Sequence, residues 1–115
     1  MENETKTPPN TTQASPAYIM VQMKVKSLED LNQRYAPFVF PILQKYQGKM
    51  IAGSATPIVA EGDWDGNWAA ILQFPSMEAA KQWYYAEEYY PLKELRINEM
   101  QLETGRVIMI DSFNV

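Results

Sequence analysis

Residues 61–96 place the tightest limits on the fold of this 115-residue chain. They begin with acidic and glycine residues, among which Asp65 and Gly66 form a strong turn signal, because glycine reaches positive φ at little steric cost. The apolar run 69–72 then predicts a central strand, and Ser76 predicts the N-cap of a helix. This stretch therefore predicts a turn, a buried strand and a helix in immediate succession.

The residues before this stretch predict a strand, a helix and a second strand. Residues 17–25 are rich in β-branched and aromatic side chains, which favours a strand. An amphipathic helix is expected to begin after Ser27 and to end near Gly48, where glycine is typical of a helix C-terminus. Pro37 and Pro41 lie inside its pattern, and they predict a kink or break around Tyr35 to Pro37.

The elements combine into a β-α-β-β-α-β order. The strand after residue 48 is interrupted by Gly53 and Pro57, so an edge or bulged strand is expected. The second helix loses its periodicity around residues 86–90, and residues 106–111 predict the last strand. This order is typical of an α+β ferredoxin-like fold, in which a four-stranded antiparallel sheet carries both helices on one face.

Such a sheet leaves its other face without helices. A face as apolar as this one is expected to be covered rather than left in water. The simplest cover is a second copy packed sheet to sheet, so a homodimer is expected. The amides of Gln22 and Gln73 would then bond across the dimer axis or line a cavity for a polar ligand. The residues assigned to this face are Tyr18, Met20, Gln22, Ala69, Ile71, Gln73, Val107 and Met109.

Residues 1–16 differ in composition from the rest of the chain. They contain almost nothing apolar, which predicts a disordered N-terminal tail, and residues 17–115 are expected to form a single ferredoxin-like domain. The N-terminus has neither the basic start nor the apolar middle of a secretory signal, so a cytoplasmic protein is expected. No apolar run approaches the roughly 20 residues needed to cross a bilayer.

The composition also restricts the chemistry. The chain contains neither cysteine nor histidine, which excludes thiolate catalysis, an imidazole base and the commonest metal and haem ligands. Glu61, Asp63 and Asp65 lie in a turn that normally faces water, so no metal site and no cofactor are expected; haem bound through tyrosine is the weakest alternative. A net charge of -4 without a basic block argues against nucleic acid.

A series of short motifs resembles a known family. In their order and spacing they are similar to the landmarks of the domain-of-unknown-function family 1330, from about Tyr18 to Asp111. The resemblance implies a dimeric α/β barrel of two ferredoxin-like sheets and no established reaction. The wider superfamily that it resembles includes cofactor-free oxygenases, small-molecule isomerases, chlorite-dismutase-like haem proteins and stress-responsive barrels. The motifs are Glu61-Gly62-Asp63-Trp64, Phe74-Pro75-Ser76, Ala79-Ala80, Trp83-Tyr84, Glu88-Tyr89 and Leu95-Arg96.

The chain also departs from the family pattern. Tyr46 stands where many relatives have histidine, so chemistry that needs this imidazole is not expected here. Gln47 and Gly48 stand where many relatives have a pair of glycines.

Arg96 is the charged residue most indicative of a site. It follows Leu95 on the inward side of an otherwise apolar helix, and a partly buried guanidinium must find acceptors on the protein or on a ligand. The structural interpretation is an ion pair with Glu61 or Glu88, or exposure to solvent near Glu99. The functional interpretation is contact with an anionic ligand.

The aromatic residues near Arg96 offer walls for a pocket, although such residues are also typical of a core or a dimer contact. The leading hypothesis is a small homodimer that binds a small organic molecule, an anionic aromatic one being a candidate, in a cleft between sheet and helices. The alternative is a dimeric structural or interaction module without small-molecule chemistry. An enzyme would be cofactor-independent, oxygenase- or isomerase-like, with an anion on Arg96 and a proton moved by a tyrosine or Glu88. The candidate ligand-binding residues are Arg96, Trp64, Tyr84, Glu88, Tyr89 and Glu61.

Overall fold

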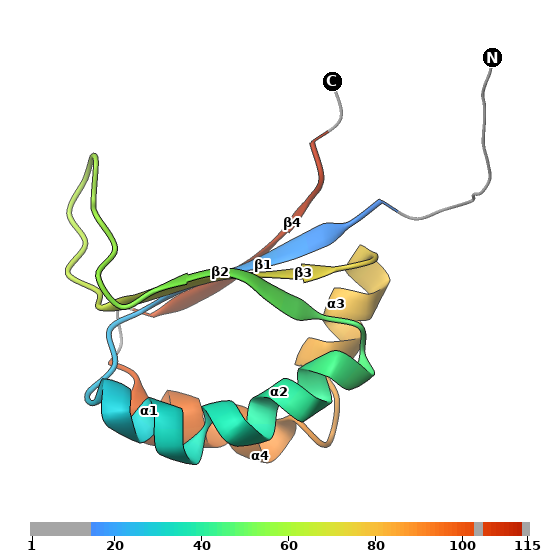
Figure 1. Cartoon of the computed structure of the whole chain (residues 1–115), viewed down its shortest axis with the longest axis horizontal. Coiled ribbons are helices and arrows are strands. Elements are labelled where there is room, and N and C mark those ends of the chain that lie inside the picture. Colours follow the sequence, from blue (N-terminus) through green and yellow to red (C-terminus); the bar gives the residue numbers. More distant parts are fainter. Residues whose placement is uncertain (1–14, 103–104, 114–115) are drawn as a thin grey trace.

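The computed structural model describes residues 15–102 and 105–113, and it has the predicted α+β architecture (Figure 1). One antiparallel sheet has the strand order β2-β3-β1-β4, and the helices lie on one side of it. This is the predicted ferredoxin-like arrangement. The predicted tail falls almost wholly outside the described residues. The strands are β1 (Ala17–Met23), β2 (Lys49–Ser54), β3 (Trp68–Phe74) and β4 (Arg106–Asp111).

Each predicted helix is divided into two α-helices, and the second continues into a π-helical turn. The Ser27 hydroxyl accepts a hydrogen bond from the backbone N–H of Asp30, and the Ser76 hydroxyl accepts one from Ala79, so both predicted caps are confirmed. None of the described helices has the length and apolarity that crossing a membrane requires. The helices are α1 (Leu28–Arg34), α2 (Ala36–Lys45), α3 (Met77–Tyr84), α4 (Tyr90–Leu95) and the π-helix η1 (Arg96–Met100).

The break between α1 and α2 falls at Tyr35, as Pro37 predicts. Tyr35 has φ -120° and ψ -56°, outside helical geometry. Pro37 occupies the second position of α2, where a missing N–H costs no internal hydrogen bond. Pro41 lies within α2 and does not end the helix, which continues to Lys45. Its side chain is exposed.

The β2–β3 connection differs from the predicted tight turn. The ladder is irregular between Met50 and Ala52, as expected for a bulged edge strand, but β2 ends at Ser54. Residues 55–67 form a long arm that projects from the sheet on the side away from the helices (Figure 1). The glycine with positive φ is Gly62, not Gly66. The expected Asp65-Gly66 turn is therefore wrong.

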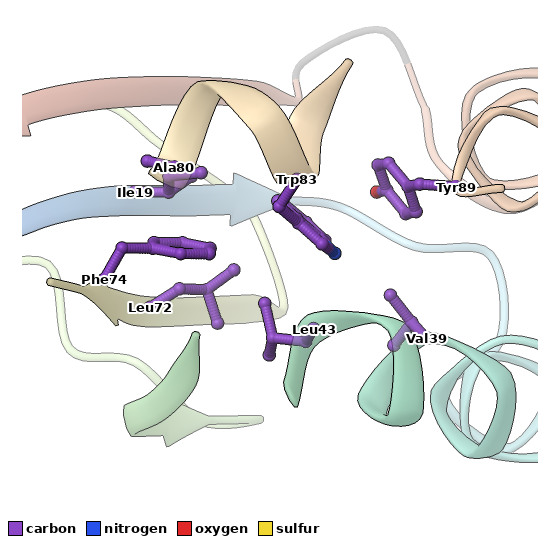
Figure 2. Close-up of a cluster of buried hydrophobic side chains, with 8 residues drawn as sticks. All are labelled: Ile19, Val39, Leu43, Leu72, Phe74, Ala80, Trp83 and Tyr89. Atoms are coloured by element: carbon purple, nitrogen blue, oxygen red, sulfur yellow. The ribbon is translucent and has the colours of Figure 1, made fainter. Parts of the chain in front are cut away.

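The core lies between the sheet and the helices. In its larger part, the Trp83 ring stacks on Tyr89 with centroids 4.4 Å apart and packs against Phe74 at 5.7 Å (Figure 2). A second cluster, around Met23 and Met100, joins β1 to η1. The larger cluster consists of Ile19, Val39, Leu43, Leu72, Phe74, Ala80, Trp83 and Tyr89.

The strand register corrects the assignment of β4 to the two faces of the sheet. Val107 lies opposite Val21, and Met109 lies opposite Ile19, which is fully buried under the helices. Cross-strand partners share a face, so Val107 and Met109 belong to the helix side and their expected place on the open face is wrong. The residues of β4 on the open face are Arg106, Ile108 and Ile110.

Candidate functional site

A cavity of about 170 Å³ lies between the helix side of the sheet and the helices. Its floor is formed mainly by apolar residues of β1 and β3, and its roof by residues of α1, α2, α3 and η1 together with Tyr35 and Tyr89. Asn32, Phe40 and Met50 line it and are exposed, so they mark where it opens to solvent. Apolar residues of its wall include Ile19, Val21, Val39, Leu43, Ala70 and Leu72.

Two tyrosines bring their hydroxyl groups together at the cavity wall. Tyr35 enters from the break between α1 and α2, and Tyr89 from the last residue before α4. Their hydroxyl oxygens are 2.5 Å apart, and the rings meet edge to face with centroids 6.5 Å apart. Burial raises the pKa of Tyr35 well above its ordinary value, and Tyr89 adds to this rise while Arg96 opposes it. Tyr35 is therefore neutral at physiological pH.

Arg96 is the charged residue of the cavity. It is only 3% exposed and begins η1, the wider turn in which the backbone N–H of Gln101 donates to the Arg96 carbonyl at 2.9 Å. This turn brings the Gln101 side chain back onto the guanidinium, whose Nη1 donates to Gln101 Oε1 at 2.7 Å. The same nitrogen lies 4.0 Å from the sulfur of Met23. Both of these partners are neutral.

The guanidinium of Arg96 keeps its proton despite burial. Burial by itself lowers the pKa of Arg96, but the neighbouring Tyr89 and Tyr35 hydroxyls outweigh it and the net shift is upward. No carboxylate of residues 15–102 or 105–113 forms an ion pair with this charge. The expected pairing with Glu61 or Glu88 is wrong. The ion pairs of these residues are Lys24–Asp65, Arg34–Asp30, Arg34–Glu99 and Lys45–Glu88.

Trp83 contributes a further hydrogen-bond donor to the cavity. Its side chain is 3% exposed, and its Nε1 has no acceptor among the described residues. Figure 2 shows this nitrogen pointing toward the space between Tyr89 and Val39, which both line the cavity. The charged and unpartnered polar groups at the cavity wall are thus donors, which suits a ligand with acceptor oxygens. In the described part of the chain, no three Asp or Glu side chains gather as metal ligands would.

The structure brings together three of the six predicted site residues: Arg96, Tyr84 and Tyr89 all line the cavity. Glu61 and Trp64 lie apart, in the arm between β2 and β3. Glu61 is exposed there, and the Trp64 ring packs against Gly66 so closely that a Cβ on this glycine would overlap it.

Glu88 is also outside the cavity. Its carboxylate accepts hydrogen bonds on the surface from Lys45 Nζ at 3.1 Å and from the Tyr46 hydroxyl at 2.9 Å. These bonds, that of Lys45 first, lower the pKa of Glu88. A salt-bridged surface carboxylate of this kind is a poor proton shuttle for a ligand inside the cavity.

Two residues of the site, Tyr35 and Trp83, are not among the candidate ligand-binding residues predicted from the sequence. The signal for Tyr35 is its place before Pro37, because a residue at a helix break directs its side chain differently from its helical neighbours. Helical periodicity offers no comparable signal for Trp83, since it places the ring on the inner face without showing whether the indole N–H finds a partner.

Three solved structures illustrate the similarity of this fold to known ones. The methylated RPA0582 protein superimposes with a TM-score of 0.72, at 13% identity, covering 89% of this chain and 84% of that one. RPA0582 of Rhodopseudomonas palustris, a protein of unknown function, gives 0.68 at 13% identity, covering 90% and 86%. SnoaB of Streptomyces nogalater, a cofactor-independent oxygenase, gives 0.55 at 12% identity, covering 89% and 97%. At these identities the likeness shows the fold alone.

The sequence itself matches a protein family. No curated protein matches it. The profile described as "Domain of unknown function (DUF1330)" matches residues 16–111, which include every described strand and helix. This chain therefore belongs to the DUF1330 family.

Proposed function

We propose that the protein binds a small organic anion in the cavity between the sheet and the helices, with Arg96 holding the negative group. The observation that carries this proposal is the buried guanidinium at the wall of an apolar cavity, where its hydrogen-bonded protein partner is the neutral amide of Gln101. A buried charge is costly unless an opposite charge compensates it. A carboxylate or enolate oxygen on the ligand would supply that compensation.

The cavity also restricts the rest of the ligand. About 170 Å³ is small beside the roughly 300–1,000 Å³ of typical drug-sized pockets, so the ligand is compact. Tyr84, Tyr89, Trp68 and Trp83 add aromatic surface to the aliphatic floor. These walls favour a single aromatic ring or a branched apolar body attached to the anionic group.

Any reaction at this site proceeds without a cofactor in our proposal. The fold supports this view, since SnoaB shares it and is a cofactor-independent oxygenase. The Tyr35–Tyr89 hydroxyl pair replaces Glu88 as the proton-handling group, because it lies at the cavity wall while Glu88 does not. Arg96 would stabilise negative charge that develops on the bound molecule.

The substitution Gln101→Glu tests the anion site. It places a carboxylate of nearly the same shape 2.7 Å from Arg96 Nη1 and so satisfies the guanidinium within the protein. We expect the affinity for benzoate and related carboxylates to fall about 10-fold or more, while the free energy of unfolding does not fall. Isothermal titration and urea denaturation measure the two quantities.

Arg96→Met provides the comparison, because it removes the charge and keeps much of the length of the side chain. It is expected to abolish carboxylate binding and to leave the binding of uncharged analogues such as toluene in place. Carboxylate affinities that stay at the wild-type level in both variants would contradict the proposal. They would favour the alternative, a structural or interaction module without small-molecule chemistry.

We also propose that the protein is a homodimer that packs through the open face of the sheet. Ile108 and Ile110 on this face are each 41% exposed, and Met20 and Ile71 lie on the same face of the two central strands, β1 and β3. None of the described helices covers this side (Figure 1). Apolar area of this kind favours a partner surface, and the same face on a second copy is complementary to it.

A further inference from the structure

Trp83 is held rigidly while its one polar atom is left without a partner. Its ring stacks on Tyr89 at 4.4 Å and packs against Phe74 at 5.7 Å and Tyr84 at 6.0 Å. The ring therefore has little freedom to turn toward an acceptor elsewhere. A buried N–H without a hydrogen bond has lost its bonds to water and gained none in return, so such groups are rare and need an explanation.

Water is a poor explanation for this donor. A buried water molecule needs two to four polar partners. Val39 and Leu43 flank the space that the nitrogen faces, and neither offers a hydrogen bond (Figure 2). The Tyr89 hydroxyl keeps an acceptor position beyond its bond to Tyr35, but this single partner is fewer than a buried water needs. A ligand in this space would place an acceptor oxygen against the indole N–H. Unlike a water molecule, the ligand would be held by its other contacts and would need no further polar partner at this point.

We infer that Trp83 Nε1 determines specificity by donating to a second oxygen of the ligand, apart from the anionic group on Arg96. This inference rests on the proposed function, since it assumes an anion on Arg96. The two donors come from different elements, α3 and η1, and line one cavity. The ligand class is a compact hydroxy- or oxo-carboxylate with an aromatic or branched apolar body. A plain carboxylate of the same size would leave the indole N–H unpaired.

The test compares each oxygenated carboxylate with its plain parent. The probes are benzoate with its three hydroxybenzoate isomers, and phenylacetate with phenylglyoxylate. At least one oxygenated probe should bind the wild-type protein about 3- to 10-fold more tightly than its parent, in line with one added hydrogen bond. In Trp83→Phe, which keeps a stacking ring and loses the donor, this preference should fall to less than about 2-fold.

Trp64 offers a matched control, because its Nε1 is also buried and without a partner but Trp64 does not line the cavity. Trp64→Phe should keep the full preference. In the ¹⁵N-labelled wild-type protein, the indole N–H signals of the three tryptophans can be followed separately. The Trp83 signal should move strongly with the preferred probe and the Trp64 signal should not.

The outcomes separate the inference from the proposed function. If carboxylates bind, but none of the oxygenated probes is preferred or the preference survives Trp83→Phe, the inference is overturned and the anion site stands. If no carboxylate binds the wild-type protein, the proposed function itself fails. Should Trp83→Phe not fold, the wild-type indole signals still decide: a Trp83 signal that responds alike to parent and oxygenated probes contradicts the inference.

Discussion

At the residue scale, the C-terminus of α2 has a glutamine where the backbone adopts positive φ. Gln47 has a φ of 64°, in the left-handed region that costs a residue with a side chain roughly 1–2 kcal/mol. The Gln47 N–H donates to Gln44 O and the Gly48 N–H to Leu43 O, both at 2.9 Å, which is the Schellman arrangement. Gly48 is needed for another reason, since an added Cβ would lie 2.7 Å from Leu43 Cδ1.

Gln47→Gly is therefore expected to stabilise the protein. Glycine adopts positive φ without strain, although its greater freedom in the unfolded chain offsets part of the gain. We expect the free energy of unfolding to rise by about 0.5–1 kcal/mol in urea denaturation. Gln44→Gly, the same change within the exposed helix, should lower it by a similar amount. A loss of stability in Gln47→Gly would show that its side chain makes an unrecognised favourable contact.

The raised pKa of Tyr35 predicts a loss of stability at alkaline pH. The unfolded chain ionises this tyrosine near its ordinary pKa of about 10, whereas the folded protein still holds the proton, mainly because of burial. The folded state then binds more protons, so the contribution of Tyr35 is complete below about pH 10 and is lost as pH rises toward the folded pKa.

Urea denaturation between pH 8 and 11 measures this effect. The decline above about pH 10 should be shallower in Tyr35→Phe than in the wild-type protein, because phenylalanine does not titrate. Tyr85→Phe is the control, since Tyr85 is 69% exposed. The free energy of unfolding of this variant should decline with pH in the same way as that of the wild-type protein. Parallel curves for wild type and Tyr35→Phe would contradict the assignment.

At the element scale, the two proline residues of α2 have different consequences. Pro37 lies in the first turn and costs nothing there, but Pro41 lies within the helix and removes one internal hydrogen bond. Pro41 is exposed, so Pro41→Ala should restore that bond without disturbing the core. We expect the free energy of unfolding to rise by about 1–2 kcal/mol, less than the full helix penalty because the unfolded chain also gains freedom.

Urea denaturation of Pro41→Ala beside Pro37→Ala checks this prediction. Pro37→Ala should leave stability unchanged or slightly lower, since Pro37 sits where a proline is tolerated. Equal effects of the two substitutions would show that the helix has already adjusted to Pro41, for example by bending.

The elements show which parts of this fold local sequence can predict. The Ser27 and Ser76 caps, the break at Tyr35 and the bulged edge strand follow from short-range chemistry, and each was predicted. The faces of β4 were not, because alternation shows that a strand has two faces and only the register with β1 shows which is which.

The site was predictable only where burial followed helical periodicity. The inward position of Arg96 followed from the apolar residues around it. Its contact with the neutral Gln101 depends on the π-helical turn, which no sequence pattern predicted. Trp64 and Glu61 were grouped with Arg96 because they lie in one stretch of sequence. The arm between β2 and β3 carries them away from the cavity, and such long-range placement depends on how the elements pack.

At the scale of the whole molecule, the two faces of the sheet have separate roles in our proposals. The helix side encloses the cavity within one chain, and the open side is left for a second copy. Ligand binding and dimerisation should therefore be separable. Ile71 is suited to test this, because it lies on the open face, directly across the ladder from Met20, and takes no part in the cavity.

Ile71→Lys is expected to convert the dimer into a monomer. A lysine near the centre of a packed apolar interface would lose its hydration without gaining a partner, whereas on a face open to water the same change is nearly neutral. Sedimentation velocity at micromolar concentration should show the wild-type protein as a dimer and Ile71→Lys as a folded monomer. Phe38→Lys, which replaces a 58% exposed side chain on α2, should remain dimeric.

Because the residues that line the cavity come from one chain, the Ile71→Lys monomer should bind carboxylates with the wild-type affinity. A wild-type protein that sediments as a monomer would contradict the dimer while leaving the anion site intact.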